Sequence, residues 1–398
     1  MSTEIKVEIN SEEQLTENNE KPPSCSNNFY KKYFPNSTKS DWQDWKWQIK
    51  NRVTNKKQLE KFITLTNNET KILDLHKENL PLSITPHYLS IFNLEDINDP
   101  IRKCVVPRIE ETFIAKEEAE DPLGENHQNP VSCIVHRYPD RVLFLSTKFC
   151  SSNCRYCTRS RIVGEHQCLT SNQTEWEKGF KYIQEHTEIR DVLVSGGDPL
   201  TLTDSRLEYI ISNLRKIKHV EMIRIGTKIP AVLPQRITKN LLKMLKKYHP
   251  VYMSIHFTHP NELSAETVKA CNMIADAGIP MGSQTVLLKE VNDNSEIMKK
   301  LFTGLLKIRV RPYYMYQCDL IVGSSHFRTS ITKGLEIIQN IRGYISGYGV
   351  PQFIIDAPNG GGKIPLLPEY VQGYDENDNL FLNNYIGKEY SYPDVFRE

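Results

Sequence analysis

The sequence predicts an α/β fold: a partial barrel of parallel strands, preceded by a helical arm and followed by a short C-terminal segment. Two observations predict it. The region up to about residue 130 has irregular helical patterns, whereas from about residue 140 short apolar runs alternate with helical patterns. Alternation of strands and helices is typical of a parallel sheet. Six such units indicate a barrel or partial barrel, and chemistry in such folds lies at the C-terminal ends of the strands.

The N-terminal third is expected to hold a tail and an arm. Residues 1–28 are polar and acidic, so we expect a disordered tail. Residues 29–130 are expected to form the helical arm. Four prolines break its helical pattern: Pro81, Pro86, Pro100 and Pro107.

One stretch of the arm is rich in tryptophan. Within residues 41–53, Trp42, Trp45 and Ile49 have the spacing of one helical face. Such a face could bind a partner, but packing against the main domain or a second subunit is the favoured interpretation.

The barrel is predicted over residues 131–345, and residues 346–398 form the C-terminal segment. The predicted barrel strands are 141–147, 191–197, 221–227, 251–257, 280–288 and 311–317. The predicted helices between and after them include 203–217, 238–248, 264–278 and 331–344. One further strand, 352–358, precedes a run of glycines.

Composition excludes several classes of protein. The chain has 50 Lys and Arg against 49 Asp and Glu, so no basic excess indicates a nucleic-acid partner. No apolar run approaches the length of a membrane span, about 18 residues. The N-terminus lacks the apolar segment of a secretory signal. We therefore expect a cytoplasmic protein, where thiols stay reduced.

Three of the nine cysteines crowd into eight residues. Cys150, Cys154 and Cys157 have the spacing C-x3-C-x2-C and follow the first predicted barrel strand. Closely spaced thiolates hold iron–sulfur clusters. Three ligands leave one iron of a four-iron cluster open, as a site that binds a substrate requires. The alternative is a zinc site that adds His166, but zinc loops usually pair with a second cysteine knuckle and none is evident.

A glycine turn ends the second predicted strand. Gly196 and Gly197 allow the backbone to approach a ligand, and Asp198 offers an acceptor to an ammonium group. Alone, this turn is weak support for a binding site.

The glycine run near the C-terminus, DAPNGGGKIP at 356–365, ends in Lys363. It departs from the phosphate-binding P-loop pattern. A flexible surface loop with a solvated lysine is one interpretation. The other is a lysine that forms a Schiff base with pyridoxal phosphate. Arg137 and Arg141 are then candidates for the phosphate, and Tyr138 for contact with the pyridine ring.

Taken together, these motifs resemble a known family. The cysteine spacing resembles that of the radical S-adenosylmethionine superfamily. HRYPDR, the cysteine loop, LVSGGD, VLPQRIT, RVRPYYMYQCD, HFRT and DAPNGGGK occur in this order. This order resembles the lysine 2,3-aminomutase family over roughly residues 40–385.

The resemblance implies a partial, TIM-like (β/α)6 radical SAM barrel and three cofactors. A four-iron ([4Fe–4S]) cluster on Cys150, Cys154 and Cys157 would cleave S-adenosylmethionine, with Gly196–Asp198 near the methionyl amino group. Pyridoxal 5′-phosphate would be carried by Lys363. An external one-electron reductant of the flavodoxin or ferredoxin type would prime the cluster.

The resemblance also implies the substrate contacts. Arg159 would bind the carboxylate of an amino acid, and Asp319 and Asp356 its distal ammonium. Physical chemistry agrees, because two adjacent carboxylates repel each other unless a cation lies between them. The implied function is an isomerase that interconverts L-lysine and β-lysine. Alternatives are arginine, or a lysine residue of a translation factor, as substrate. From another class, an iron–sulfur electron carrier or a zinc-stabilised scaffold would leave Lys363 and the aspartate pair unexplained.

The chain has two departures from the family pattern. Tyr156, before the last cluster cysteine, replaces a histidine of the family's bacterial enzyme, and another aromatic there could still cover the adenine. The second departure concerns a zinc site. No cysteine follows Cys318, and Asn294 stands where the family's core zinc ligand is expected. The resemblance therefore implies that this zinc site is absent. A homo-oligomer is one option for this chain, but without zinc to stabilise it.

Overall fold

The computed structural model describes residues 26–75, 80–163 and 173–394. Most of the predicted tail lies outside these ranges. The first helix, α1 (Ser26–Tyr33), begins within the last residues assigned to the tail, so that boundary was placed too late.

The N-terminal arm consists of short helices, as predicted. They are α1, α2 (Lys39–Gln43), α3 (Trp45–Lys50), α4 (Lys56–Leu59), α5 (Asn67–Leu75), α6 (Pro86–Ser90) and α7 (Pro100–Val105), with the 3-10 turns η1 (Ile109–Thr112) and η2 (Glu125–Gln128). Pro86 and Pro100 occupy the first positions of α6 and α7. The backbone N–H at the first position of a helix makes no hydrogen bond within the helix, so a proline there loses nothing. These two prolines therefore begin helices and do not interrupt them.

The single helix expected around residues 41–53 is wrong. Asp44 ends α2, and its side chain accepts a hydrogen bond from the backbone N–H of Lys46 to cap α3. Trp42 is buried and packs against Trp47, with ring centroids 6.0 Å apart. Trp45 lies against the guanidinium of Arg236 in the barrel domain. These tryptophans therefore serve packing.

One sheet of nine strands forms the centre of the molecule, in the order β1 to β9. The strands are β1 (Ile134–Tyr138), β2 (Arg141–Thr147), β3 (Asp191–Gly196), β4 (Met222–Thr227), β5 (Val251–His256), β6 (Met281–Leu287), β7 (Arg311–Gln317), β8 (Gln352–Ala357) and β9 (Gly362–Leu366). Strands β2 to β8 are parallel, whereas β1 and β9 pair antiparallel at the two edges. The predicted partial barrel and its strands are confirmed; β1 and β9 were not anticipated.

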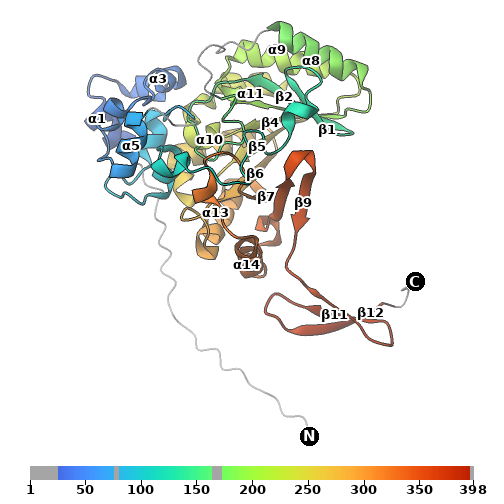
Figure 1. Cartoon of the computed structure of the whole chain (residues 1–398). Helices are drawn as coiled ribbons and strands as arrows, with labels where there is room; N and C mark the ends of the chain where they lie inside the picture. Colours follow the sequence, from blue (N-terminus) through green and yellow to red (C-terminus); the bar gives the residue numbers. More distant parts are fainter. Residues whose placement is uncertain (1–25, 76–79, 164–172, 395–398) are drawn as a thin grey trace.

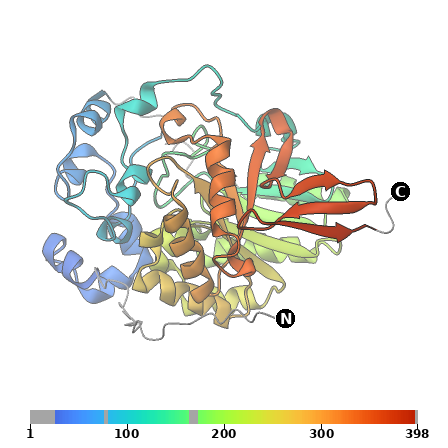
Figure 2. The ribbon, with the colours of Figure 1, turned by 90° about the horizontal axis from the view of Figure 1, so that it is seen from below.

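Helices cover the outer face of the sheet (Figures 1 and 2). They are α8 (Gln173–Glu185), α9 (Asp204–Lys216), α11 (Lys239–Lys246), α12 (Ala265–Asp276), α13 (Ser295–Lys307) and α14 (Ile331–Ile341). The short, buried helix α10 (Ile229–Val232) follows β4 and contacts α6 and α12. In α9 the buried residues are Leu207, Ile210, Ile211 and Leu214, the spacing of one helical face. None of the described helices is long and apolar enough to cross a membrane.

The C-terminal segment is not separate from the barrel. Strands β8 and β9 belong to the main sheet, so the predicted boundary at residue 345 divides it. Beyond them, β10 (Val371–Tyr374), β11 (Asn379–Asn383) and β12 (Glu389–Pro393) form a small antiparallel sheet. This sheet projects away from the body of the molecule (Figure 1). It was not predicted.

Candidate active site

The structure brings all thirteen predicted site residues to the wall of one cavity of about 470 Å³. They come from the cysteine loop after β2, the glycine turn after β3, the β1–β2 hairpin, and the ends of β7, β8 and β9. The parallel strands have their C-terminal ends on the same side of the sheet, so residues distant in sequence meet there.

The N-terminal arm holds the cysteine loop in place. The backbone N–H of Asn153 donates to the carbonyl of Ser83 at 2.9 Å, and the Ser83 hydroxyl donates to the carbonyl of Ser151 at 3.1 Å. Arg155, next to Cys154, forms a buried ion pair with Glu111 of η1. The arm therefore fixes the backbone that carries the three cysteines.

The three thiols of the cysteine loop lie on the wall of the main cavity. Cys150, Cys154 and Cys157 are free and line the cavity together. Among the described residues, no three His, Cys, Asp or Glu side chains converge as ligands of one metal ion. A four-iron cluster needs only that the sulfurs surround a common space, because each binds a different iron. His166, the fourth ligand of the zinc alternative, lies outside the described residues.

The thiols are poor thiolates without a metal. Burial, followed by the neighbouring Cys154, raises the pKa of Cys157 to about 11. Burial also raises the pKa of Cys150 and of Cys154. Iron would therefore supply the charge that holds these groups deprotonated.

The two glycines after β3 are required by close packing against the cysteine loop. A Cβ on Gly197 would lie 2.4 Å from the carbonyl oxygen of Phe149, next to Cys150. Gly196 has a φ of +126°, and its Cβ would lie 2.3 Å from the carbonyl oxygen of Thr147. From the sequence, these glycines were expected to let the backbone approach a ligand. In the structure, their missing side chains leave space for the backbone of residues 147–149, which leads into the cysteine loop.

Asp198, after β3, forms hydrogen bonds with the end of β4 and the residues that follow it. Its buried carboxylate accepts hydrogen bonds from the Thr227 hydroxyl at 2.7 Å and from the backbone N–H groups of Lys228 at 2.8 Å and Leu200 at 3.1 Å. Burial, as the largest influence, raises its pKa to about 6. Contact with the methionyl amino group stays a prediction, since these donors already occupy much of the carboxylate.

Lys363 faces Asp356 across the last strand pair. The antiparallel register of β8 and β9 pairs these two residues, and the Lys363 ammonium lies 2.8 Å from the Asp356 carboxylate. Arg137 contacts the other oxygen of that carboxylate at 2.9 Å. The backbone N–H of Lys363 donates to the Tyr138 hydroxyl at 2.9 Å. Asp356 therefore holds a primary ammonium and a guanidinium at once.

The two arginines predicted for the phosphate differ in their surroundings. Arg137 is largely engaged, because it also donates to Gln128 at 2.8 Å and to the carbonyl of Leu123 at 2.7 Å. Arg141 is about half exposed, donates from Nε and Nη2 to the Asp140 carboxylate at 2.8 and 3.3 Å, and stacks on the Tyr138 ring, with the guanidinium 5.2 Å from the ring centroid. Both arginines are therefore paired with a carboxylate, and Arg141 is the more exposed of the two. Both phosphate roles stay predictions.

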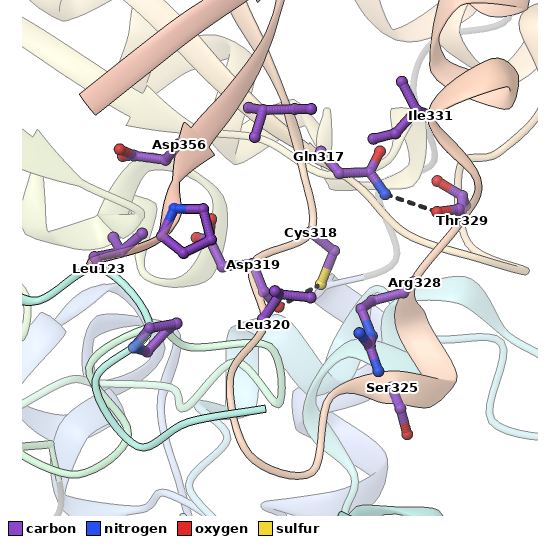
Figure 3. Close-up of a pocket in the computed structure, with 13 residues that line it drawn as sticks. Leu123, Gln317, Cys318, Asp319, Leu320, Ser325, Arg328, Thr329, Ile331 and Asp356 are labelled. Atoms are coloured by element: carbon purple, nitrogen blue, oxygen red, sulfur yellow. Dashed lines mark hydrogen bonds between the residues drawn. The ribbon is translucent and has the colours of Figure 1, made fainter. Parts of the chain in front are cut away.

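Asp319 lies just beyond β7, where two cavities meet. A second cavity of about 420 Å³ shares Leu123, Asp319 and Asp356 with the main one, and Figure 3 shows all three on its wall. Burial and then the charge of Asp356 raise the pKa of Asp319 to about 7. The two aspartates thus form an acidic end to the main cavity.

Arg159 lies at the main cavity with a partner that the sequence did not reveal. Its guanidinium donates to both carboxylate oxygens of Glu125, with a shortest distance of 2.7 Å. Burial opposes ionisation of Glu125, but Arg159 and Arg161 hold its pKa below the ordinary value. Only the fold brings Glu125 to Arg159, since 34 residues separate them and no local pattern marks either.

Comparisons with known proteins identify the family. A family model described as "Radical SAM superfamily" matches residues 144–301, and one described as "Lysine-2,3-aminomutase" matches residues 338–396. L-lysine 2,3-aminomutase of Acetoanaerobium sticklandii is 49% identical over 367 residues, which is 92% of this chain and 88% of that protein. The enzyme of the same name from Clostridium subterminale is 49% identical over 89% of this chain and 85% of its own. Glutamate 2,3-aminomutase of Clostridioides difficile is 44% identical over 89% of this chain and 83% of its own. The chain therefore belongs to the lysine 2,3-aminomutase family of the radical SAM superfamily.

Proposed function

We propose that this chain is an L-lysine 2,3-aminomutase, an isomerase that moves the amino group of lysine between C2 and C3. The observation that carries the proposal is the ion pair between Asp356 and the Lys363 ammonium, 2.8 Å long, beside the second carboxylate of Asp319. This end of the cavity already accommodates a primary alkylammonium, the group at the end of a lysine side chain. The curated relatives of the same name support it.

The residues of the chain divide the work between the two ends of the substrate. Arg159 is a match for the substrate carboxylate, because a guanidinium offers paired donors to two oxygens. Asp319 and Asp356 bind the distal ammonium and exclude an acidic side chain by repulsion. Holding both ends fixes C3 with respect to the cysteine loop.

Two bound groups would supply the chemistry that side chains lack. The cluster on Cys150, Cys154 and Cys157, with S-adenosylmethionine, supplies a radical that takes hydrogen from carbon, and pyridoxal phosphate carries the migrating nitrogen. Lys363 is the residue placed to hold pyridoxal phosphate, with Arg141 and Tyr138 beside it. Gly196–Asp198 are proposed to contact S-adenosylmethionine, which is supported by their place on the wall of the same cavity as the three cysteines.

Arginine is the second candidate substrate. It also ends in a cation, and the cavity beyond Asp319 and Asp356 offers room for a longer side chain. A glutamate substrate is disfavoured, because its side-chain carboxylate would face both aspartates.

The proposal includes the setting of the enzyme. A one-electron reductant of the flavodoxin or ferredoxin type would prime the cluster. The seven described cysteines are free thiols, in keeping with the reducing cytoplasm. A homo-oligomer is compatible with this assignment.

The test is anaerobic turnover of the reconstituted enzyme with lysine, arginine and glutamate in parallel, with each β-amino acid identified by mass spectrometry. We expect β-lysine as the main product. The Cys154→Ala variant is the control for trace contaminating activity. If β-arginine is the main product, arginine and not lysine is the substrate. If β-glutamate is the main product, the assigned role of the aspartate pair is refuted.

A further inference from the structure

We propose that residues 121–128 of the N-terminal arm are a positioning element that holds both ends of the substrate site. Glu125 orients Arg159 at the carboxylate end, and Gln128 orients Arg137, and through it Asp356, at the ammonium end. This inference rests on the proposed function. It adds two positioning residues, Glu125 and Gln128, of which Glu125 also lines the main cavity.

Glu125 fixes one edge of the Arg159 guanidinium and leaves another free. Nε and Nη2 of Arg159 donate to the Glu125 carboxylate at 2.7 to 3.1 Å. Within the described part of the chain, Nη1 of Arg159 donates to no protein group, and the side chain lines the main cavity. Arginine side chains lose considerable rotamer entropy when they are held. By holding one edge in advance, Glu125 directs the free edge to an incoming carboxylate.

The turn that carries Glu125 is itself fixed. The carboxylate of Asp121 accepts hydrogen bonds from the backbone N–H groups of Glu125 at 3.0 Å and Asn126 at 2.8 Å. Asp121 also forms an ion pair with Arg161 at 3.0 Å. Glu125 is 5% exposed, so its carboxylate has little freedom to leave Arg159.

Gln128 serves the opposite end of the site. Its side-chain oxygen accepts from Nε of Arg137 at 2.8 Å, and Nη1 of Arg137 contacts Asp356 at 2.9 Å. The carbonyl of Leu123, in the same segment, accepts from Nη2 of Arg137 at 2.7 Å. Each nitrogen of Arg137 thus has a partner, and one oxygen of Asp356 is left toward Lys363.

The same segment also packs on the glycine loop before Lys363. The backbone N–H of Asn359 donates to the carbonyl of Pro122 at 3.0 Å. A Cβ on Gly124 would lie 3.1 Å from the backbone of Asn359, so the two turns are in close contact. Residues 121–128 therefore join the cysteine loop, the β1 strand and the loop before Lys363. By fixing both residues, they set the separation between Arg159 and Asp356. This separation in turn limits the length of the substrate that can contact both ends.

Each end can be tested with a probe that lacks the group bound there. Lysine contacts both ends, 1,5-diaminopentane lacks the carboxylate, and norleucine lacks the distal ammonium. Binding of each probe to the anaerobic holoenzyme would be measured as a dissociation constant from the change in pyridoxal absorbance. This readout does not require turnover.

For the carboxylate end, Glu125→Gln keeps the shape of the side chain and removes its charge and one acceptor oxygen. We expect lysine and norleucine to bind roughly tenfold more weakly, the loss typical of a charged hydrogen bond. Binding of 1,5-diaminopentane should stay unchanged, which also shows that the variant is folded. Tighter binding of lysine would mean that Glu125 competes with the substrate, and an equal loss for all three probes would mean a general structural role; either result overturns the proposal.

For the ammonium end, Gln128→Ala removes the acceptor of Arg137 Nε. We expect lysine and 1,5-diaminopentane to bind roughly threefold to tenfold more weakly, the contribution of one hydrogen bond, with norleucine unchanged. The matched control is Glu208→Gln, which removes an exposed ion pair with Lys247 far from these contacts and should alter none of the three constants. Because Arg137 is also a candidate for the cofactor phosphate, the pyridoxal phosphate content of the variant is measured in the same samples. Loss of norleucine binding with an unchanged cofactor content would refute the separate roles at the two ends, and loss of the cofactor would assign Arg137 to the phosphate instead; either result overturns this role of Gln128.

The two proposals fail in different ways. If the wild-type enzyme makes no β-lysine, the proposed function is wrong, while the pattern of binding constants still tests the positioning roles. If β-lysine is made and the variants lose all probes equally, the proposed function stands and the positioning roles are wrong.

Discussion

Asp319 should make lysine binding depend on pH near neutrality. Its pKa is raised from 3.8 to about 7, first by burial and then by the charge of Asp356. Below that pH the carboxyl group is protonated and neutral, and above it the carboxylate can pair with an ammonium. The lysine side chain stays protonated up to about pH 10. Between pH 6 and pH 8 the ionised fraction of Asp319 rises from about 9% to about 91%, so the KM for lysine should fall about tenfold.

The assay is the anaerobic rate at several lysine concentrations from pH 5.5 to pH 9, with kcat and KM determined separately. In Asp319→Asn the KM should be higher and should lose its change near pH 7, because asparagine does not titrate there. Norleucine, used as a competitive inhibitor, lacks the ammonium and should show no such change in its inhibition constant. If Asp319→Asn keeps the same fall in KM, another group titrates and the argument from Asp319 is refuted.

Three further predictions concern the cofactor sites. Lys363→Ala should remove the pyridoxal absorbance at roughly 420 nm while keeping the visible spectrum of the cluster, and full activity in this variant would contradict the role of Lys363. Cys154→Ala should lose iron and the cleavage of S-adenosylmethionine, measured by iron analysis and by release of methionine. A full iron content in this variant would show that Cys154 is not a ligand of the cluster. Gly197→Ala should lower the iron content and the thermal midpoint together, because its Cβ would lie 2.4 Å from the carbonyl oxygen of Phe149. A normal iron content in Gly197→Ala would show that the cysteine loop can move aside.

The parts of the site that could be predicted are those in which chemistry is local in sequence. The cysteine loop is short, and its spacing alone indicates a shared cluster. The parallel strands also could be predicted, because short strand-like runs alternate along the chain with helical patterns. β2 and β7 begin and end where the apolar runs placed them, at Arg141–Thr147 and Arg311–Gln317.

The parts that could not be predicted depend on contacts between distant segments. Glu125 and Gln128 lie in an ordinary polar turn, and only the fold places them beside Arg159 and Arg137. The break at Asp44 has a local cause, but its cap competes with a helical pattern that continues through it, and the pattern was the stronger signal. The strand β9 is short and begins in a glycine run, so neither alternation nor apolar length identified it.

On the proposed roles of Asp319 and Asp356, charge would explain how a common fold can serve substrates of opposite sign. The glutamate enzyme of Clostridioides difficile is 44% identical to this chain, so most of the fold is shared. Two unit charges about 4 Å apart interact by about 4 kcal/mol at an effective dielectric constant of 20, a factor of roughly a thousand in affinity. A single uncompensated contact of an acidic side chain with Asp319 or Asp356 would therefore be enough to exclude it. The same argument cannot separate lysine from arginine, since both bring a positive charge. Discrimination between them depends on the length and hydrogen-bond geometry of the side-chain end, and on our proposal residues 121–128 set the length by fixing Arg159 and Asp356.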